Sequence, residues 1–176
     1  MKNFFLTPFL FILFFSMNAQ TSIYDIDINN ISGQSINLSD FKGKYVLFVN
    51  VASQCGFTYQ YKDLQKLQDK YNNLVVIGVP CNQFGSQEPG TNDQIQAFCS
   101  DNYNITFIMT EKINVKGNDQ HMLYKWLTTK DLNGIKNSSV KWNFQKYIID
   151  PSGAFIDYFY STTKPFSDKI ISILEQ

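Results

Sequence analysis

The chain has 176 residues, with 15 acidic groups balanced by 15 lysines and no arginine, so its formal net charge is zero. This length suits one domain with a sizeable core. A near-neutral surface without guanidinium groups lacks the positive footprint that nucleic-acid binding requires, so we expect no nucleic-acid partner.

The N-terminal segment predicts a secretory signal peptide over residues 1–19, followed by a single domain over 20–176. One lysine precedes an almost entirely apolar stretch, and Ala19 is a small residue suited to cleavage. Met17 is large for such a site, so the alternative is an uncleaved membrane anchor. We expect an exported, extracytoplasmic protein, which in a Gram-negative bacterium would be periplasmic.

The first half of the domain alternates strand and helix patterns. Polar and apolar residues alternate over 22–30 and 34–41 around a Ser-Gly pair, which predicts an N-terminal β-hairpin. Residues 45–52, "YVLFVNVA", and 74–80, "LVVIGVP", are continuous apolar runs typical of central strands covered on both faces. Apolar residues recur at helical spacing over 59–71, which predicts a helix between these strands.

The second half continues the same pattern. We expect a helix over 91–102, a short strand over 105–109 and a helix over 119–130. A hairpin over 144–161 then turns at a Pro-Ser-Gly sequence, and an amphipathic helix over 166–176 closes the chain. This order predicts an α/β fold with a central mixed sheet flanked by helices. It is the order expected of a thioredoxin-like fold.

The three cysteines, Cys55, Cys81 and Cys99, do not have the pattern of a disulfide scaffold, because their number is odd and their spacings are wide. With a single histidine, His121, and no C-x-x-C motif, the usual spacings cannot assemble a zinc or haem site. Glycine-rich phosphate-binding motifs are also absent from the sequence. We therefore expect no metal and no cofactor. For Cys81, which follows a strand directly, a small packed side chain is the better interpretation.

Cys55 lies where the first central strand gives way to a helix. Unpaired backbone N–H groups and the positive end of a helix dipole favour a thiolate at such a place. A thioredoxin-type dithiol needs a second cysteine three residues later, where this chain has Thr58. Cys55 therefore cannot close a local disulfide. It is either a reactive thiol with a distant partner or an ordinary small core residue.

Two further segments carry neutral hydrogen-bond donors. "VPCNQFGSQEPG" (79–90) leaves the sheet at the edge where Cys55 should lie, and "KWNFQKYIID" (141–150) enters the late hairpin. Their donors are the Gln83 and Gln87 amides, the Trp142 indole N–H and the Asn143 amide. Such groups can stabilise a thiolate and a developing oxyanion without taking up a proton. The alternative is that the glutamines are solvated and that Trp142 belongs to the core.

The segments "NVASQCGFT", "GVPCNQFGSQEPG" and "KWNFQKYIID" closely resemble the three signature segments of the glutathione peroxidase family, over roughly residues 22–174. The resemblance implies a thioredoxin-like fold and an antioxidant enzyme that reduces hydrogen peroxide or organic hydroperoxides in the response to oxidative stress. Carried across, the peroxidatic residue is Cys55, a cysteine in place of selenocysteine. Gln87, Trp142 and Asn143 complete the implied catalytic set.

The resemblance also implies an electron donor. Many cysteine-containing members look like thioredoxin-dependent enzymes with a resolving cysteine in the helix after "QEPG", a position that Cys99 fills here. A Cys55–Cys99 disulfide would then be reduced by a thioredoxin-like dithiol protein. Glutathione is the alternative donor, disfavoured because no arginine could hold its carboxylates. The segment between Lys130 and Lys141 is shorter than in tetrameric relatives, which predicts a monomer or weak dimer.

Three other functions compete with the peroxidase. A thiol–disulfide oxidoreductase on the same fold is disfavoured by Thr58. A peroxide sensor would pass its oxidation to a partner protein through Cys99. A redox-inert binding domain is disfavoured because all four positions of the implied catalytic set are filled.

Overall fold

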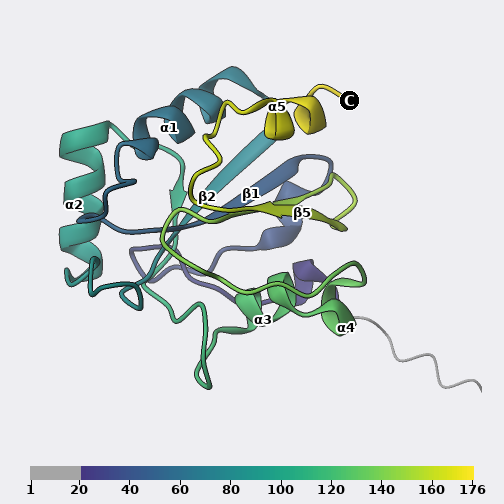
Figure 1. Ribbon diagram of the computed structural model, residues 1–176, viewed down its shortest axis with the longest axis horizontal. Coiled ribbons are helices and arrows are strands. Elements are labelled where there is room, and N and C mark those ends of the chain that lie inside the picture. Colours follow the sequence, from purple (N-terminus) through teal and green to yellow (C-terminus); the bar gives the residue numbers. More distant parts are fainter. Residues whose placement is uncertain (1–20) are drawn as a thin grey trace, which may run out of the picture.

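A five-stranded mixed sheet forms the centre of the protein, in the order β3-β2-β1-β4-β5 (Figure 1). The computed structural model describes residues 21–176, so the expected signal peptide lies outside the described residues. The strands are β1 (Tyr45–Val51), β2 (Leu74–Pro80), β3 (Ile108–Met109), β4 (Lys146–Ile149) and β5 (Phe155–Phe159). β1, β2 and β3 run parallel, whereas β4 and β5 pair antiparallel beyond β1. The expected α/β fold with a mixed sheet is confirmed.

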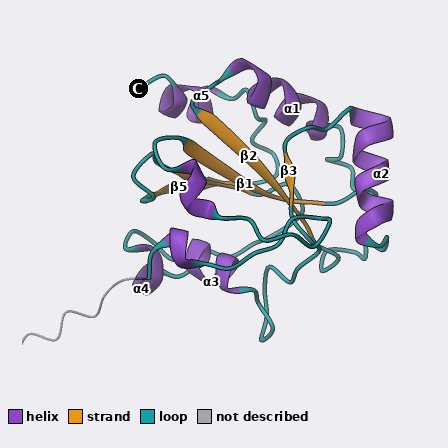
Figure 2. Cartoon of the chain, turned by 180° about the vertical axis from the view of Figure 1, so that it is seen from behind, coloured by secondary structure: helices purple, strands orange, loops and turns teal. Residues whose placement is uncertain are grey.

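Helices cover both faces of this sheet (Figures 1 and 2). The α-helices are α1 (Gln60–Lys70), α2 (Asn92–Tyr103), α3 (Met122–Thr128), α4 (Lys130–Asn133) and α5 (Asp168–Leu174), and the 3-10 helices are η1 (Ile23–Asp25) and η2 (Leu38–Phe41). Side chains of α1, α2 and α5 pack on one face, and those of α3, η1 and η2 pack on the other. Within residues 21–176, every helix falls short of the length and apolar character needed to cross a membrane.

The central strands bury both of their faces, as their unbroken apolar runs predicted. In β1, Leu47 and Val49 point to the face covered by α1, and Phe48 points to the face covered by α3. Val51 pairs with Pro80 at the last position of the β1–β2 ladder. Because the two parallel strands end together, the loops that follow them leave the sheet at the same edge.

Several elements are shorter than the sequence pattern predicts. The N-terminal hairpin forms as a turn in which Asn29 and Ser35 make a single antiparallel bridge, while the flanking residues become η1 and η2. β3 has only two residues, and the helix expected over 119–130 is divided into α3 and α4 at Thr129. Side chains on these segments still reach the core. The apolar pattern therefore predicted correctly which residues are buried, but it predicted longer regular elements than the structure has.

A lysine lies completely buried on β4, among apolar side chains. Lys146 donates hydrogen bonds from its Nζ to the Gln60 side-chain oxygen at 2.6 Å and to the Phe144 carbonyl at 2.8 Å. Both partners are neutral. Burial lowers the pKa of Lys146 from 10.5 to about 7, because the ammonium loses its hydration without gaining a counter-ion.

This buried lysine predicts a pH dependence of stability. An unfolded lysine stays protonated up to about pH 10.4, so between about pH 7 and that value unfolding takes up a proton. Stability should therefore rise with pH through this window, by up to about 1.4 kcal/mol per pH unit. Urea denaturation at pH 6.5–8.5 should show a steeper rise for the wild type than for Lys146→Met. Lys136→Met, which removes a surface cation, is the control and should keep the wild-type slope; equal slopes for all three proteins would contradict the prediction.

Candidate active site

Cys55 lies in the loop after β1, at the carboxyl edge of the sheet. Its side chain is 9% exposed, and its Sγ accepts the backbone N–H of Phe57 at 3.4 Å. Thr58 accepts the Cys55 backbone N–H at 3.0 Å through its hydroxyl, which donates to the Ala52 carbonyl at 2.8 Å. α1 begins only at Gln60, so Cys55 is further from the helix than expected. A local amide, rather than the first turn of α1, is the donor that reaches the sulfur.

Gln87 and Asn143 are joined to this loop by hydrogen bonds. The Gln54 backbone N–H donates to the Gln87 carbonyl at 3.0 Å, and the Asn143 side-chain amide donates to Gln87 Oε1 at 3.0 Å. This bond fixes the orientation of the Gln87 amide, and its nitrogen has no hydrogen-bond partner among residues 21–176, so it is a free donor. Asn143 is completely buried, and its Oδ1 has no hydrogen-bond partner among the described residues. It offers the site an open acceptor.

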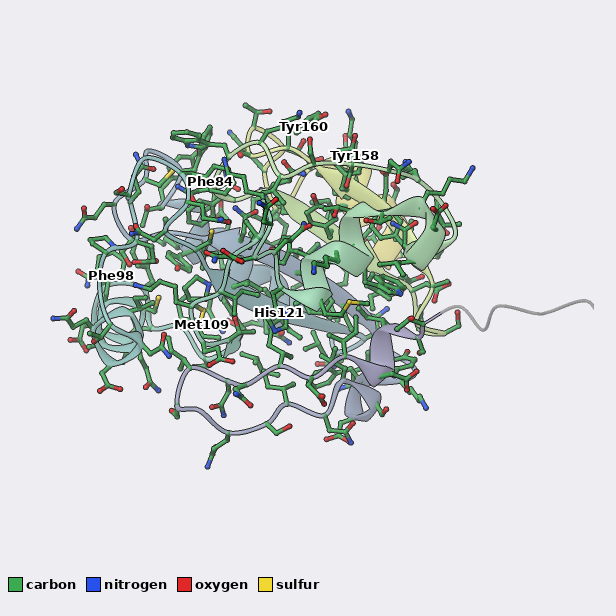
Figure 3. All side chains as sticks on the ribbon, turned by 90° about the horizontal axis from the view of Figure 1, so that it is seen from below. Phe84, Phe98, Met109, His121, Tyr158 and Tyr160 are labelled. Atoms are coloured by element: carbon green, nitrogen blue, oxygen red, sulfur yellow. The ribbon has the colours of Figure 1, made fainter. Side chains whose placement is uncertain are left out.

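Trp142 is the most exposed of the four expected site residues, with 39% of its surface accessible. Its ring lies 5.8 Å from the ring of Phe84, which comes from the loop after β2. Figure 3 shows Phe84 between Phe98 of α2 and the Tyr158–Tyr160 pair near the end of β5. Within residues 21–176, the Trp142 indole N–H has no hydrogen-bond partner, so it is available as a donor. The alternative that Trp142 is a core residue is wrong.

Asn50 is a functional candidate that the sequence reasoning did not single out. It is completely buried, its side-chain amide donates to the Trp142 carbonyl at 3.0 Å, and its backbone carbonyl accepts the Phe144 N–H at 2.5 Å. Phe144 has a positive φ of 64°, a conformation that a bulky residue adopts only when its surroundings enforce it. Asn50 thus holds the segment that carries Trp142 and Asn143. An amide interrupting the apolar run of β1 was the signal that could have identified it.

Gln83, the other glutamine in the loop after β2, has a structural role. Its Oε1 accepts the backbone N–H groups of Val115 and Lys116 at 2.8 and 3.1 Å, and its Nε2 donates to the Lys116 carbonyl at 2.9 Å. Both ends of the amide are therefore occupied by the backbone of one neighbouring loop.

The sheet separates the three cysteines into two groups. Cys55 and Cys99 belong to the apolar cluster between the sheet and α1, α2 and α5. Cys81 belongs to the cluster on the opposite face, where it is completely buried, and its Sγ accepts the Gln83 backbone N–H at 3.5 Å. All three thiols are free. Cys55 and Cys99 therefore share one apolar cluster, whereas Cys81 packs in the other.

Cys99 is a buried thiol in α2, with only 2% of its surface exposed. Burial raises the pKa of Cys99 to about 11; the nearby Tyr61 hydroxyl opposes this rise, and the charge of Glu88 adds to it. The N-terminus of α2 is capped by two reciprocal hydrogen bonds. The Thr91 side chain accepts the Gln94 backbone N–H, and the Gln94 side chain accepts the Thr91 backbone N–H. Cys99 is therefore a protonated, inert thiol as long as α2 stays folded.

The fold and these contacts together define a cysteine-dependent oxidoreductase. One thiol lies at the edge of a thioredoxin-like sheet, in a loop that hydrogen bonds join to neutral amide side chains, and a second thiol lies on the same face in a separate helix. Neutral donors can stabilise both a thiolate and the alkoxide or hydroxide that leaves when an O–O bond breaks. Among the described residues, His, Cys, Asp and Glu side chains form no cluster that could hold a metal ion.

Comparison with known proteins agrees with this assignment. The sequence profile of the family described as "Glutathione peroxidase" matches residues 23–128. Glutathione peroxidase-like peroxiredoxin 2 of Saccharomyces cerevisiae is 44% identical over 149 residues, covering 84% of this chain and 92% of the yeast protein. Hydroperoxy fatty acid reductase gpx1 of Synechocystis is 40% identical over 167 residues, covering 90% and 96% of the two chains. The apo crystal structure of Trgpx has a TM-score of 0.67 and 40% identity over 89% of this chain and 97% of its own.

The chain therefore belongs to the glutathione peroxidase family. The family resemblance, the thioredoxin-like fold and the thiol peroxidase function expected from the sequence are confirmed.

The donor groups predict a loss of rate when they are removed. Gln87→Ala and Trp142→Ala should each slow the first oxidation of Cys55 by about 10²-fold, equivalent to about 2–3 kcal/mol of lost charge stabilisation. Stopped-flow oxidation by hydrogen peroxide measures this step directly. Gln83→Ala is the matched control, because its amide serves the neighbouring loop; it should lower stability with little effect on rate. Wild-type rates in both test variants would assign Gln87 and Trp142 to structure alone.

Proposed function

We propose that this protein reduces hydrogen peroxide and organic hydroperoxides through Cys55 and is recycled through a Cys55–Cys99 disulfide. The observation that carries the proposal is the grouping of Cys55 with three neutral polar side chains at one edge of the sheet. The Gln54 backbone N–H donates a hydrogen bond to the Gln87 carbonyl, and the Asn143 side-chain amide donates one to Gln87 Oε1. These bonds hold two loops that are distant in sequence beside the loop that carries Cys55.

The proposed reaction has two thiol steps. The Cys55 thiolate attacks one oxygen of the hydroperoxide, so an S–O bond forms, the O–O bond breaks, and the alkoxide or hydroxide leaves as an alcohol or water after taking up a proton. Cys99, as a thiolate, then attacks the sulfur of the Cys55 sulfenic acid. An S–S bond forms, and the departing hydroxide becomes water. An external dithiol returns both cysteines to thiols.

The surroundings of the thiol favour a dithiol protein over glutathione as donor. A pocket of about 410 Å³ lies between the Cys55 loop and α2, and its lining is Ser53, Gln54, Glu88, Pro89, Gly90, Gln94, Ile95 and Phe98. None of these residues is basic, and Glu88 is acidic. The ammonium of Lys112 lies beside the pocket, but it already donates to the Glu88 and Gly90 carbonyls at 3.2 and 2.6 Å, so the lining offers a poor site for the carboxylates of glutathione. The peroxiredoxin name of the yeast relative supports the same choice.

Steady-state peroxide consumption tests the function and the donor together. The reduced protein is supplied with hydrogen peroxide or an organic hydroperoxide, with thioredoxin and its reductase or with glutathione and its reductase. We expect turnover of both peroxides with thioredoxin and much slower turnover with glutathione. Absence of turnover with either donor, together with unreactive Cys55, would refute the peroxidase. Full turnover with glutathione alone would refute only the donor.

Export to an extracytoplasmic compartment is part of the proposal and rests on the apolar N-terminal segment. A secreted enzyme of this kind needs a dithiol carrier outside the cytosol. Mass spectrometry of the protein isolated from its source tests this: export with cleavage predicts a chain that begins near residue 20, and an intact N-terminus favours the anchor.

A further inference from the structure

The buried ammonium of Lys146 requires an explanation, because it is costly to the fold. It lies on the same face of the sheet as Cys55 and Cys99, and its two hydrogen-bond partners, Gln60 and Phe144, are neutral. An apolar side chain of similar volume would avoid the loss of hydration that a buried ammonium suffers. Within the described part of the chain, burial alone accounts for its lowered pKa, with no acidic group to oppose it. A buried ammonium that has only neutral hydrogen-bond partners points to a role beyond packing.

A continuous series of hydrogen bonds leads from this lysine to the catalytic loop. Lys146 Nζ donates to Gln60 Oε1 at 2.6 Å, and Gln60 Nε2 donates to the Ser161 carbonyl at 2.8 Å. Ser161 Oγ donates to the Asn143 carbonyl at 2.5 Å, and Asn143 Nδ2 donates to Gln87 Oε1 at 3.0 Å. Gln60, Asn143 and Lys146 are completely buried, and Ser161 is 7% exposed. Water therefore has little access to the links between these residues.

The second hydrogen bond of Lys146 acts on the same segment more directly. It ends on the carbonyl of Phe144, the residue whose φ of 64° turns the chain between Asn143 and β4. A left-handed conformation at a bulky residue is strained and persists only where the surroundings hold it. Asn50 holds the Phe144 N–H, and Lys146 holds its carbonyl. The two bonds clamp both sides of the strained residue.

We propose that Lys146 is a positioning residue for the peroxidase reaction: through Phe144 and through Gln60 and Ser161, it holds Asn143 in the orientation that directs Gln87 toward Cys55. This inference rests on the proposed function for its catalytic consequence, but not for its structural one. The two hydrogen bonds of Lys146 end on Gln60 and Phe144, not on the thiol loop, and Lys146 does not line the pocket beside that loop. Its effect on the rate is exerted through Asn143.

Two readouts test the proposal, and only one depends on peroxidase chemistry. The first is the NMR signal and hydrogen-exchange rate of the Asn143 side-chain amide in the reduced protein. The second is the stopped-flow rate constant for oxidation of Cys55 by hydrogen peroxide. The variants are Lys146→Met and Ser161→Ala, each alone and combined with Asn143→Ala. Lys136→Met is the control, because the Lys136 ammonium pairs with Asp157 at the surface.

We expect Lys146→Met to shift the Asn143 amide signal, to speed its exchange and to slow Cys55 oxidation by about tenfold, with a smaller effect from Ser161→Ala. Because coupled residues are not additive, both losses should nearly vanish in the Asn143→Ala background. The control should match the wild type.

An unchanged Asn143 amide in folded Lys146→Met would overturn the proposal, even if the rate fell. Equal fold-losses with and without Asn143 would also overturn it, because Lys146 would then act by another route. If Lys146→Met does not fold, Ser161→Ala decides, since it breaks the series of hydrogen bonds and leaves the lysine in place. If the wild-type thiol does not react with peroxide while the Asn143 amide responds as expected, the proposed function fails and the positioning role stands.

Discussion

Replacing Cys55 by serine should abolish peroxide reduction. A serine hydroxyl is not ionised near neutral pH and cannot pass through a sulfenic acid, so both the attack and the disulfide are lost. The substitution is nearly isosteric, and the Phe57 N–H that reaches Sγ can reach an oxygen in the same place. Peroxide consumption with thioredoxin as donor measures the effect.

Cys81→Ser is the matched control for this experiment. Cys81 is buried like Cys55 but belongs to the cluster on the other face of the sheet, so its replacement should preserve turnover in a folded protein. Turnover by Cys55→Ser at more than about a tenth of the wild-type rate would refute Cys55 as the attacking thiol. Equal losses in Cys55→Ser and Cys81→Ser would show that the measurement reports folding rather than chemistry.

Replacing Cys99 by serine should leave the first oxidation of Cys55 nearly intact but stop turnover with thioredoxin. Without a resolving thiol, the sulfenic acid persists and is oxidised further, so sulfinic acid should accumulate at Cys55. Stopped-flow kinetics follow the first step, and mass spectrometry of the Cys55 peptide measures over-oxidation. Continued turnover of Cys99→Ser with thioredoxin would contradict the resolving role.

This prediction also depends on the protonation state of the Cys99 thiol in the folded protein. With a pKa of about 11, roughly one Cys99 in 10⁴ is a thiolate at pH 7, compared with about 3% of an exposed thiol. The disulfide therefore has to form after α2 opens and exposes Cys99 to water. Cys99 lies in the C-terminal half of α2, where its carbonyl accepts the backbone N–H groups of Asn104 and Ile105, so the opening has to break these two hydrogen bonds.

The disulfide itself can be identified directly. After one equivalent of peroxide, peptide mapping of the wild type should find Cys55 joined to Cys99, with Cys81 free. A Cys55–Cys81 bridge would move the resolving role to Cys81. If no bridge forms, the resolving role is wrong, while the attacking role of Cys55 is judged by the serine variant.

Local sequence patterns were sufficient to predict the fold. The apolar runs of β1 and β2 and the helical spacing of α1 and α2 each appear where they were expected. These patterns work because the backbone geometry of a strand or a helix sets the period at which side chains point toward the core, and apolar residues recur at that period. They failed where regular structure depends on a partner: β3 pairs over only two residues, and the N-terminal turn makes one bridge.

For the site, sequence and tertiary structure contributed different things. The order of strands predicted that the loops carrying Cys55 and Gln87 leave the sheet at one edge, since parallel strands end together. The family resemblance supplied Trp142, Asn143 and Cys99, whose roles stay predictions.

The chemical character of each side chain depended on the three-dimensional structure. Only the packed structure shows that Gln83 is occupied by a neighbouring loop, that Cys81 and Cys99 lie on opposite faces of the sheet, and that Lys146 is buried without a counter-ion. The physical reason is that hydration, hydrogen-bond partners and hence proton affinity depend on atoms brought together from distant parts of the chain. The sequence by itself determined which elements form and which residues stand at their ends; the tertiary structure decided which of those residues are free to react.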